Sequence, residues 1–351
     1  MRKYSILIVM LVLLVSSQFA CGQETLQILT WPHYYSPQLL EDFETRYGVT
    51  IELVEMDAPQ KIKEEVIKNQ QIDLIITDAP IVRELIVVDM VDPLDKELIP
   101  NLSNIDKLFL NLPHDPKNLY TVPYHYIPFG LLYNADKLDE EDVSLKSYFE
   151  PSENLKGRIS IYPDPRLNIG FAMKYLGNSF NSTADRDLQA VKSLLENLNQ
   201  NSIKKSKDMT RGTYQVVYEI DKGLADMGLW YYTHNDFSQI GAKSNIKVKI
   251  PCEGVRLGVD VFAIPSHTDQ RELAHKFINY FYNPGNAAKS VEALTYPVAI
   301  MGVRERLEPT FAQKVFLSPQ ILQKSEFQIP FTNQEDRLYQ QLWDRVFKNS
   351  E

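Results

Sequence analysis

The chain has 351 residues, of which 44% are hydrophobic and 24% charged, with 14 Gly, 20 Pro and 2 Cys. These values are ordinary for a globular protein and exclude disordered, collagen-like and disulfide-rich chains, while the length predicts about two domains. The formal net charge of −9 argues against nucleic acid as a partner, because the only basic run is the short stretch 204–207.

The first twenty residues have the layout of a secretory signal peptide. Two basic residues precede a ten-residue apolar run, 6–15, which is too short to span roughly 30 Å of hydrocarbon. Cys21 follows at the position of the lipid-bearing cysteine of a bacterial lipobox, although Gln18 stands where that motif has an aliphatic residue. Cleavage after Gly22 is the alternative. We therefore expect residues 1–20 to be removed and the mature chain to lie in the periplasm or on the outer face of the bacterial membrane.

Cys252 is the second of the two cysteines. If Cys21 carries lipid, no intramolecular disulfide can form. We expect Cys252 to be a small buried apolar side chain. No other apolar stretch after the signal peptide is long enough to predict a transmembrane helix.

In chain order, the mature sequence first alternates short apolar strands with helices. Strands are expected at 26–29, 50–54 and 74–76. One helix follows Ser36-Pro37 and ends at Gly48, and a second begins at Pro59. This β-α-β-α-β order predicts right-handed crossovers and a parallel sheet covered on both faces.

A second α/β unit follows without a Gly/Ser-rich linker. Its expected strands are 129–133, 158–162, 226–230 and 259–264, and its expected helices are 168–176, 187–198 and 272–282, the last stopped by 283–285. We predict an α/β fold of two lobes, each a mainly parallel sheet flanked by helices, joined by crossover strands. The expected boundaries are 24–129 plus 262–305 for lobe 1 and 130–257 plus 310–351 for lobe 2.

Motifs of catalysis are missing from the sequence. It contains no dinucleotide-binding or phosphate-binding glycine loop, no nucleophile elbow and no His-Glu-x-x-His, and its six histidines lack metal-ligand spacing. We therefore expect neither an enzyme nor a bound cofactor or metal. A hydrolase that uses Asp164 and Asp260 as a carboxylate pair is the remaining enzymatic alternative.

Aromatic residues gather at the ends of predicted strands, in the segments 31–35, 124–126 and 230–232. Ligands of open α/β sheets bind beyond the strand ends, where such rings can enclose a slender apolar or cationic ligand. The alternative for each ring is ordinary core packing.

Two aspartates lie close to predicted strands. Asp260 falls inside the apolar stretch 257–264, where a carboxylate must meet a cation, a donor cluster or water, and we favour a ligand role for it. Asp164 lies between two prolines, where a local capping role is an equally natural explanation.

Three segments carry a resemblance to a known family. Residues 29–34, 115–124 and 277–281, the last leading to Tyr296-Pro297, resemble the bacterial spermidine/putrescine-binding proteins of ABC importers, and the similarity covers nearly the whole mature chain. The resemblance implies a two-lobed periplasmic-binding-protein fold that closes over a polyamine. It also implies two membrane partners, a permease and its ATPase.

In that family, aromatic rings sandwich the methylene chain and carboxylates pair with the ammonium groups, contacts that are each worth roughly 1 to 2 kcal/mol when desolvated. Matched position by position, the resemblance implies ligand contacts at Trp31, Tyr34, Asp164, Tyr231, Asp260 and Gln328.

The sequence also departs from the family. Leu167 stands in place of a glutamate that binds ammonium, and Gly258 stands in place of a tryptophan. The other departures are Pro32 for a small hydroxyl residue, Pro80 for an aromatic residue and Tyr231 for tryptophan. Either another acid compensates, or the ligand is smaller, less charged or different. The candidate acids are Glu253, Asp78 and Asp236.

Two further readings stay open. Tyr231-Tyr232 resembles the tyrosine pair with which bacterial iron-binding receptors hold Fe³⁺, a cation that prefers oxygen ligands. The second interpretation is a receptor-like protein that has lost transport and acts in sensing or adhesion.

Overall fold

The structure is a computed structural model that describes residues 24–203, 214–232, 242 and 245–348. The signal peptide, the lipidation candidate Cys21 and the candidate acid Asp236 lie outside the described residues. Within the described ranges, none of the helices is both long and apolar enough to cross a membrane.

The first lobe begins with the predicted alternation. Strands β1 (Thr25–Thr30), β2 (Thr50–Glu55) and β3 (Leu74–Asp78) pair in parallel in the order β2-β1-β3. They alternate with helices α2 (Pro37–Tyr47), α3 (Pro59–Lys68) and α4 (Ala79–Val87). The Ser36 hydroxyl accepts a hydrogen bond from the Leu39 N–H, and Gly48 ends α2 with φ of 68°, as its sequence predicts.

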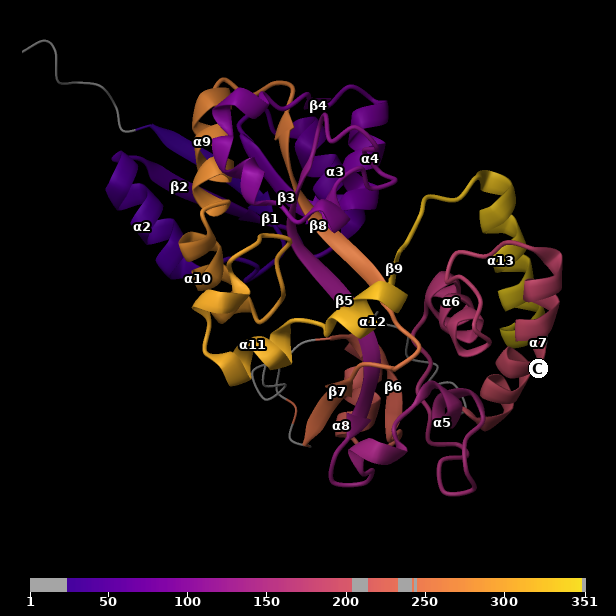
Figure 1. Cartoon of the computed structure of the whole chain (residues 1–351). Helices are drawn as coiled ribbons and strands as arrows, with labels where there is room; N and C mark the ends of the chain where they lie inside the picture. The colour runs from indigo at the N-terminus through magenta and orange to yellow at the C-terminus, as the bar shows by residue number, and fades with distance from the viewer. Residues whose placement is uncertain (1–23, 204–213, 233–241, 243–244, 349–351) are drawn as a thin grey trace, which may run out of the picture.

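Two long strands connect this lobe to the rest of the protein. β8 (Arg256–Pro265) pairs antiparallel with β3, and β5 (Val122–Asn134) pairs antiparallel with β8. β6 (Met227–Tyr231) and β7 (Ile246–Lys249) then pair antiparallel with β5. Figure 1 shows β5 and β8 running between the two groups of elements, so the fold is mixed α/β and two-lobed.

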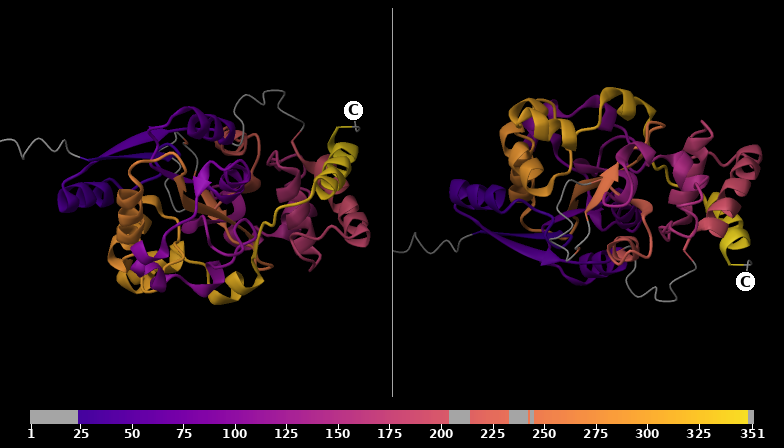
Figure 2. Two further views of the ribbon diagram at one scale, coloured as in Figure 1. Left: turned by 90° about the horizontal axis from the view of Figure 1, so that it is seen from above. Right: turned by 90° about the horizontal axis from the view of Figure 1, so that it is seen from below.

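Helices form most of the second lobe. These are α5 (Leu145–Phe149), α6 (Pro165–Tyr175), α7 (Asp185–Asn201), α8 (Gln215–Asp221) and α13 (Asn333–Phe347). Figure 2 shows α6, α7 and α13 gathered on one side of the molecule. The Asn199 amide of α7 donates to the Val346 carbonyl of α13 at 2.8 Å, so the last helix of the chain is fastened to the second lobe.

The remaining elements complete the two lobes. The helices are α9 (Arg271–Phe281), α10 (Pro284–Leu294), α11 (Pro309–Val315) and α12 (Pro319–Lys324), and the two-residue strands are β4 (Val91–Asp92) and β9 (Glu326–Phe327). Short 3₁₀ turns occupy 96–98, 100–104, 107–109, 140–142 and 304–306. β9 pairs in parallel with the first residues of β8. The chain that follows β9, beginning with Gln328, therefore lies beside Arg256.

Several local expectations differ from the structure. The predicted strand 158–162 is reduced to isolated bridges from Ile159 to Ser202 and Met227, because the chain turns at Pro163 and begins α6 at once. The expected strand 129–133 is the second half of β5. The strands of the second lobe pair antiparallel where parallel pairing was expected, because β5 and β8 cross between the lobes as neighbours.

Two smaller corrections concern single residues. The stop signal at 283–285 ends α9 but also starts α10, since the Asn283 side chain accepts from the Gly285 N–H. Cys252 is exposed, not buried as expected, because it lies in a turn before β8.

Candidate functional site

Two carboxyl groups face each other where the first lobe meets the crossing strand. The antiparallel register of β3 and β8 places Asp78 directly opposite Asp260, with both side chains on one face of the sheet. Burial, together with the charge of Asp78, raises the pKa of Asp260 to about 8. Burial also raises the pKa of Asp78, against the opposing charge of Arg256. The pair therefore holds a proton at neutral pH, in a position that a ligand's ammonium group could take.

Tyr34 lies beside this pair. Its ring packs edge-on against Tyr124 and Tyr296, with centroids 5.4 and 5.9 Å away. Its hydroxyl is near enough to Asp260 to favour the charged carboxylate, yet it is buried with no hydrogen-bond partner in bonding geometry among the described residues. A buried donor left open next to a carboxyl group suits a site that is completed by a ligand.

A second aromatic group lies where β5 and β6 pair. The rings of Phe129 and Tyr231 are 4.5 Å apart, and the Tyr162 hydroxyl donates to the Tyr231 hydroxyl at 3.2 Å. The guanidinium carbon of Arg256 lies 4.9 Å from the centre of the Phe129 ring, a cation-π contact. The aromatic group formed by Phe129, Tyr162 and Tyr231 therefore already contacts a cation of the protein, Arg256.

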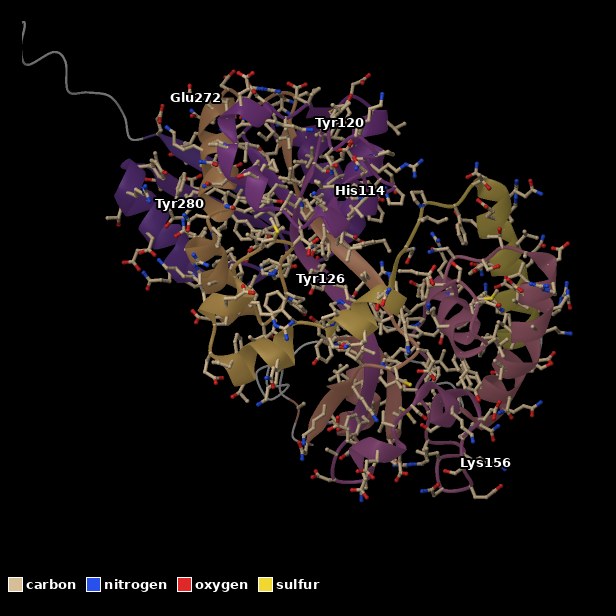
Figure 3. The ribbon with its side chains drawn as sticks, viewed as in Figure 1. His114, Tyr120, Tyr126, Lys156, Glu272 and Tyr280 are labelled. Atoms are coloured by element: carbon tan, nitrogen blue, oxygen red, sulfur yellow. The ribbon has the colours of Figure 1, made fainter. Side chains whose placement is uncertain are left out.

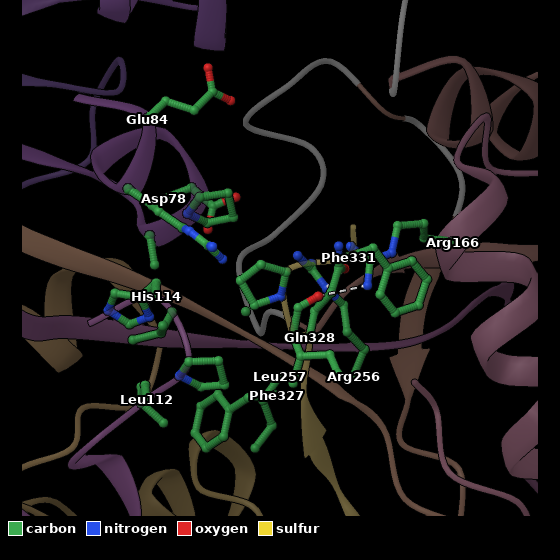
Figure 4. Close-up of a pocket in the computed structure, with 18 of the residues that line it drawn as sticks. Asp78, Glu84, Leu112, His114, Arg166, Arg256, Leu257, Phe327, Gln328 and Phe331 are labelled. Carbon is green, nitrogen blue, oxygen red and sulfur yellow. Dashed lines mark hydrogen bonds between the residues drawn. The ribbon is translucent and has the colours of Figure 1, made fainter. Parts of the chain in front are cut away.

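A cavity of about 400 Å³ opens between the two lobes. Figure 4 shows Asp78 and Glu84 on one side of it and Arg166 and Arg256 on the other. Its lining comes from the end of β3 and from α4, including Arg83, from 112–114, from Arg166 of α6, from the first residues of β8, and from 327–331 with α13.

His114 lines the same cavity from the first lobe. Figure 3 shows it there, with Lys156 at the far end of the second lobe. Burial lowers the pKa of His114 to about 4, so this ring is neutral at pH 7. One ring nitrogen lies 3.2 Å from the Thr121 hydroxyl. His114 therefore adds no charge to the cavity.

Of the six expected ligand contacts, only Gln328 is among the described residues that line this cavity. Gln328 lines it, and its side-chain carbonyl accepts from the Arg256 Nε at 2.9 Å. Tyr34 and Asp260 lie together at the acidic pair, and Tyr231 lies in the second aromatic group. Trp31 is half-buried and packs between the hydrophobic clusters on the two faces of the sheet.

Asp164 has the capping role that its sequence context left open. Its carboxylate accepts from the backbone N–H groups of Arg166 and Leu167 at 2.8 and 3.2 Å, which caps the start of α6. The Leu167 side chain is almost fully buried in the core of the second lobe. The position at which the resemblance implies a glutamate therefore presents no polar group to the cavity.

Arg256 is the residue that sequence reasoning missed. It shares one face of β8 with Gly258 and Asp260, because alternate residues of a strand point the same way. A side-chain carbon at Gly258 would lie 3.4 Å from an Arg256 terminal nitrogen. The guanidinium therefore lies over the glycine that stands in place of a tryptophan.

The alternatives to an organic ligand lose support from the same geometry. The Tyr232 hydroxyl donates to the Lys314 carbonyl at 2.6 Å, whereas the Tyr231 hydroxyl meets Tyr162. The two phenol groups thus contact different parts of the protein and do not converge on one Fe³⁺ ion. Across the described ranges, no group of three or more His, Cys, Asp or Glu side chains is placed to hold a metal ion.

Comparison with known proteins identifies relatives along most of the chain. Residues 38–315 match the family model described as bacterial extracellular solute-binding protein. The spermidine/putrescine-binding periplasmic protein of Salmonella typhimurium is 27% identical over 319 residues, 90% of this chain and 89% of that protein. Its Escherichia coli counterpart is 28% identical over 308 residues, 87% of this chain and 86% of that protein.

The fold has a close counterpart among solved structures. A spermidine/putrescine ABC transporter substrate-binding protein from Streptococcus pneumoniae superposes with a TM-score of 0.81 at 22% identity. The match covers 92% of this chain and 98% of that one, so both lobes share the fold.

Proposed function

Because the chain belongs to the bacterial extracellular solute-binding proteins, which are receptors and not enzymes, we propose that it is the substrate-binding receptor of an ABC importer. It captures a polyamine such as putrescine or spermidine, or a related small organic cation, between its two lobes. The named relatives bind spermidine and putrescine. The observation that carries the proposal is the buried Asp78–Asp260 pair beside the Tyr34 ring, in which Asp78 lines the cavity between the lobes.

Each candidate contact has a part in this proposal. Asp260 receives the ligand's ammonium group, with Asp78 as the compensating acid. Tyr34 completes this end with its hydroxyl, and Gln328 supplies a polar contact from the cavity wall. Trp31 and Tyr231 supply aromatic walls when the lobes close, as the resemblance implies. Asp164 contributes by holding the start of α6 in place.

The receptor role requires membrane partners and an extracytoplasmic location. We propose delivery to a permease and its ATPase, with the chain in the periplasm or held at the outer face of the membrane by a lipid on Cys21. The signal-like start of the sequence and the periplasmic names of the relatives support this location.

The same proposal includes closure of the lobes on the ligand. Lobe 1 comprises 24–129 plus 262–305, and lobe 2 comprises 130–257 plus 310–351. The hinge lies in β5 and β8, because these two strands pass from one lobe to the other.

A thermal-shift panel tests the function. The mature chain is mixed with putrescine, spermidine, spermine, 5-aminopentanoate, neutral sugars and ferric citrate. A ligand at 100 times its Kd adds about 2.7 kcal/mol to the free energy of unfolding, so an amine should raise the melting temperature and a sugar should not. Asp260→Asn should remove the shift, while Asp344→Asn on α13, an acid outside the cavity, should keep it. The function is wrong if no amine shifts the melting temperature.

A further inference from the structure

The side of the cavity nearest the second lobe carries two arginines, Arg256 and Arg166, and each has donors that lack an acceptor within the described chain. Arg256 gives its Nε hydrogen to Gln328, and its two terminal nitrogens make no hydrogen bond to any described residue. Arg166 donates from one terminal nitrogen to the Ile329 carbonyl at 2.8 Å, and its guanidinium carbon lies 3.5 Å from the centre of the Phe331 ring. The Arg166 Nε is buried and has no partner within the described chain.

The positive charges on this side also lack a direct ion pair. Neither Arg166 nor Arg256 has an ion pair within 4 Å among the described residues. Burial lowers the pKa of Arg166, and the charge of Arg256 lowers it further, while Asp336 and Asp164 oppose this. The two guanidinium groups are therefore close enough to repel each other, and Asp336 and Asp164 offset this at Arg166 without forming an ion pair with it.

Three acids of the described chain line the cavity, and none of them forms an ion pair with Arg166 or Arg256. Glu84 is paired with Lys63 on the rim. Asp336, at the start of α13, lies near Arg166 without forming an ion pair. Asp78 faces Asp260 at the opposite side. The first-lobe end of the cavity thus carries the Asp78 carboxyl group, with Arg83 also in the lining, and the other end carries the Arg256 and Arg166 guanidinium groups, with Asp336 also in the lining.

A diamine or triamine matches only the first of these ends. Ammonium groups are donors and cations, so a second one at Arg256 would meet like charge and would leave the guanidinium hydrogens unpaired. A carboxylate has the opposite properties, since it accepts two parallel hydrogen bonds from a guanidinium.

We propose that the ligand of this receptor is an amine with a carboxylate at its other end, that is, an ω-amino acid. Its ammonium group binds at the Asp78–Asp260 pair and its carboxylate binds at Arg256 and Arg166. The inference rests on the proposed function, because it needs an amine held between the lobes, and it narrows the class of that amine.

The spacing on β8 sets the length of the ligand. An Arg256 terminal nitrogen lies over Gly258, and Gly258 and Asp260 are two residues apart, about 7 Å along the strand. A ligand with about four to six carbons spans this gap. Gly258 leaves the path open, because it has no side chain.

Calorimetric titration of the mature chain with three ligands of one length tests the inference. The ligands are 5-aminopentanoate, with an ammonium and a carboxylate group, cadaverine, with two ammonium groups, and pentylamine, with one. We expect 5-aminopentanoate to bind at least tenfold more tightly than either amine. In Arg256→Met, which keeps an apolar chain against Phe129, 5-aminopentanoate should lose at least tenfold and cadaverine should gain. Arg345→Met, on α13 outside the cavity, is the matched control and should change neither.

Three results overturn the inference. If cadaverine binds more tightly than 5-aminopentanoate and Arg256→Met leaves that order unchanged, the ligand is a polyamine, and the proposed function stands without the inference. If pentylamine equals 5-aminopentanoate, the carboxylate contributes nothing. If none of the three ligands binds and no polyamine shifts the melting temperature, the inference and the proposed function fail together.

Discussion

Binding of an amine should release a proton from the Asp78–Asp260 pair. Without ligand, burial and the facing carboxyl group raise the pKa of Asp260 to about 8. An ammonium group favours the charged carboxylate, so its arrival displaces the proton. At pH 6, about one in a hundred Asp260 carboxyl groups is charged, and at pH 8 about half are. The affinity for an amine should therefore rise about tenfold per pH unit from pH 6 and level off above pH 8.

Titration calorimetry measures both parts of this prediction. A primary amine with a pKa above 10 stays charged throughout, so a change in its affinity between pH 6 and 9 belongs to the protein. Repeating the titration at pH 7 in two buffers of different ionisation enthalpy counts the protons, and we expect close to one released. Asp260→Asn should bind weakly and without pH dependence, while Asp344→Asn should behave as the unaltered chain. An affinity that stays flat from pH 6 to 8, or proton uptake on binding, would refute the argument.

The same raised pKa determines how stability changes with pH in the ligand-free protein. The folded-state pKa of Asp260 lies above the value near 4 of an unfolded chain, so the folded state binds the proton more tightly. Its contribution to stability is fully present below about pH 4 and is lost as the pH rises to about 8. The melting temperature of Asp260→Asn should fall less over this range than that of the unaltered chain.

Three further predictions, at Asp164, Gly170 and Cys252, test separate parts of the structure. Asp164→Ala should cost about 1 kcal/mol in the free energy of unfolding by loss of the α6 cap, and Asp164→Asn should restore most of it in urea denaturation. Gly170→Ala should cost about 1 to 3 kcal/mol in the same assay, because the added methyl group overlaps the buried ring of Phe180; unchanged stability would contradict this packing. Cys252 should react with a thiol reagent in the native protein, slowly at pH 7 because burial and Glu253 raise its pKa; a native protein without a reactive thiol would contradict its exposure.

Elements specified by neighbouring residues were predictable from the sequence. Helix α2 begins and ends as expected, because Ser36 and Gly48 act through contacts within one turn of the helix. The parallel order of β1, β2 and β3 follows from the alternation of short apolar strands with helices. Asp260 could be predicted as a site residue because burying a carboxylate among apolar strand residues is unfavourable unless it has a partner.

Contacts between distant parts of the chain were not predictable in this way. The pairing of β5 with β8 joins residues about 130 positions apart, and nothing local distinguishes it from parallel pairing. Asp78 stood only among three possible compensating acids until the register of β3 against β8 placed it opposite Asp260. The cap at Asp164 depends on α6 starting at Pro165, three residues before the predicted start.

An error in one strand boundary concealed the chemistry of the second end of the cavity. The expected strand 259–264 excludes Arg256, whereas β8 begins at that residue and continues with the same alternation through Gly258 to Asp260. When residues 256–258 are included in the strand, the Arg256 guanidinium lies on the same face of β8 as Asp260. It lies over Gly258, the residue that stands in place of a tryptophan. Read by itself, Gly258 is a lost aromatic wall and predicts a weaker polyamine site. Read with Arg256, the same glycine makes room for a cation of the protein, and this is the basis for proposing a carboxylate at that end of the ligand.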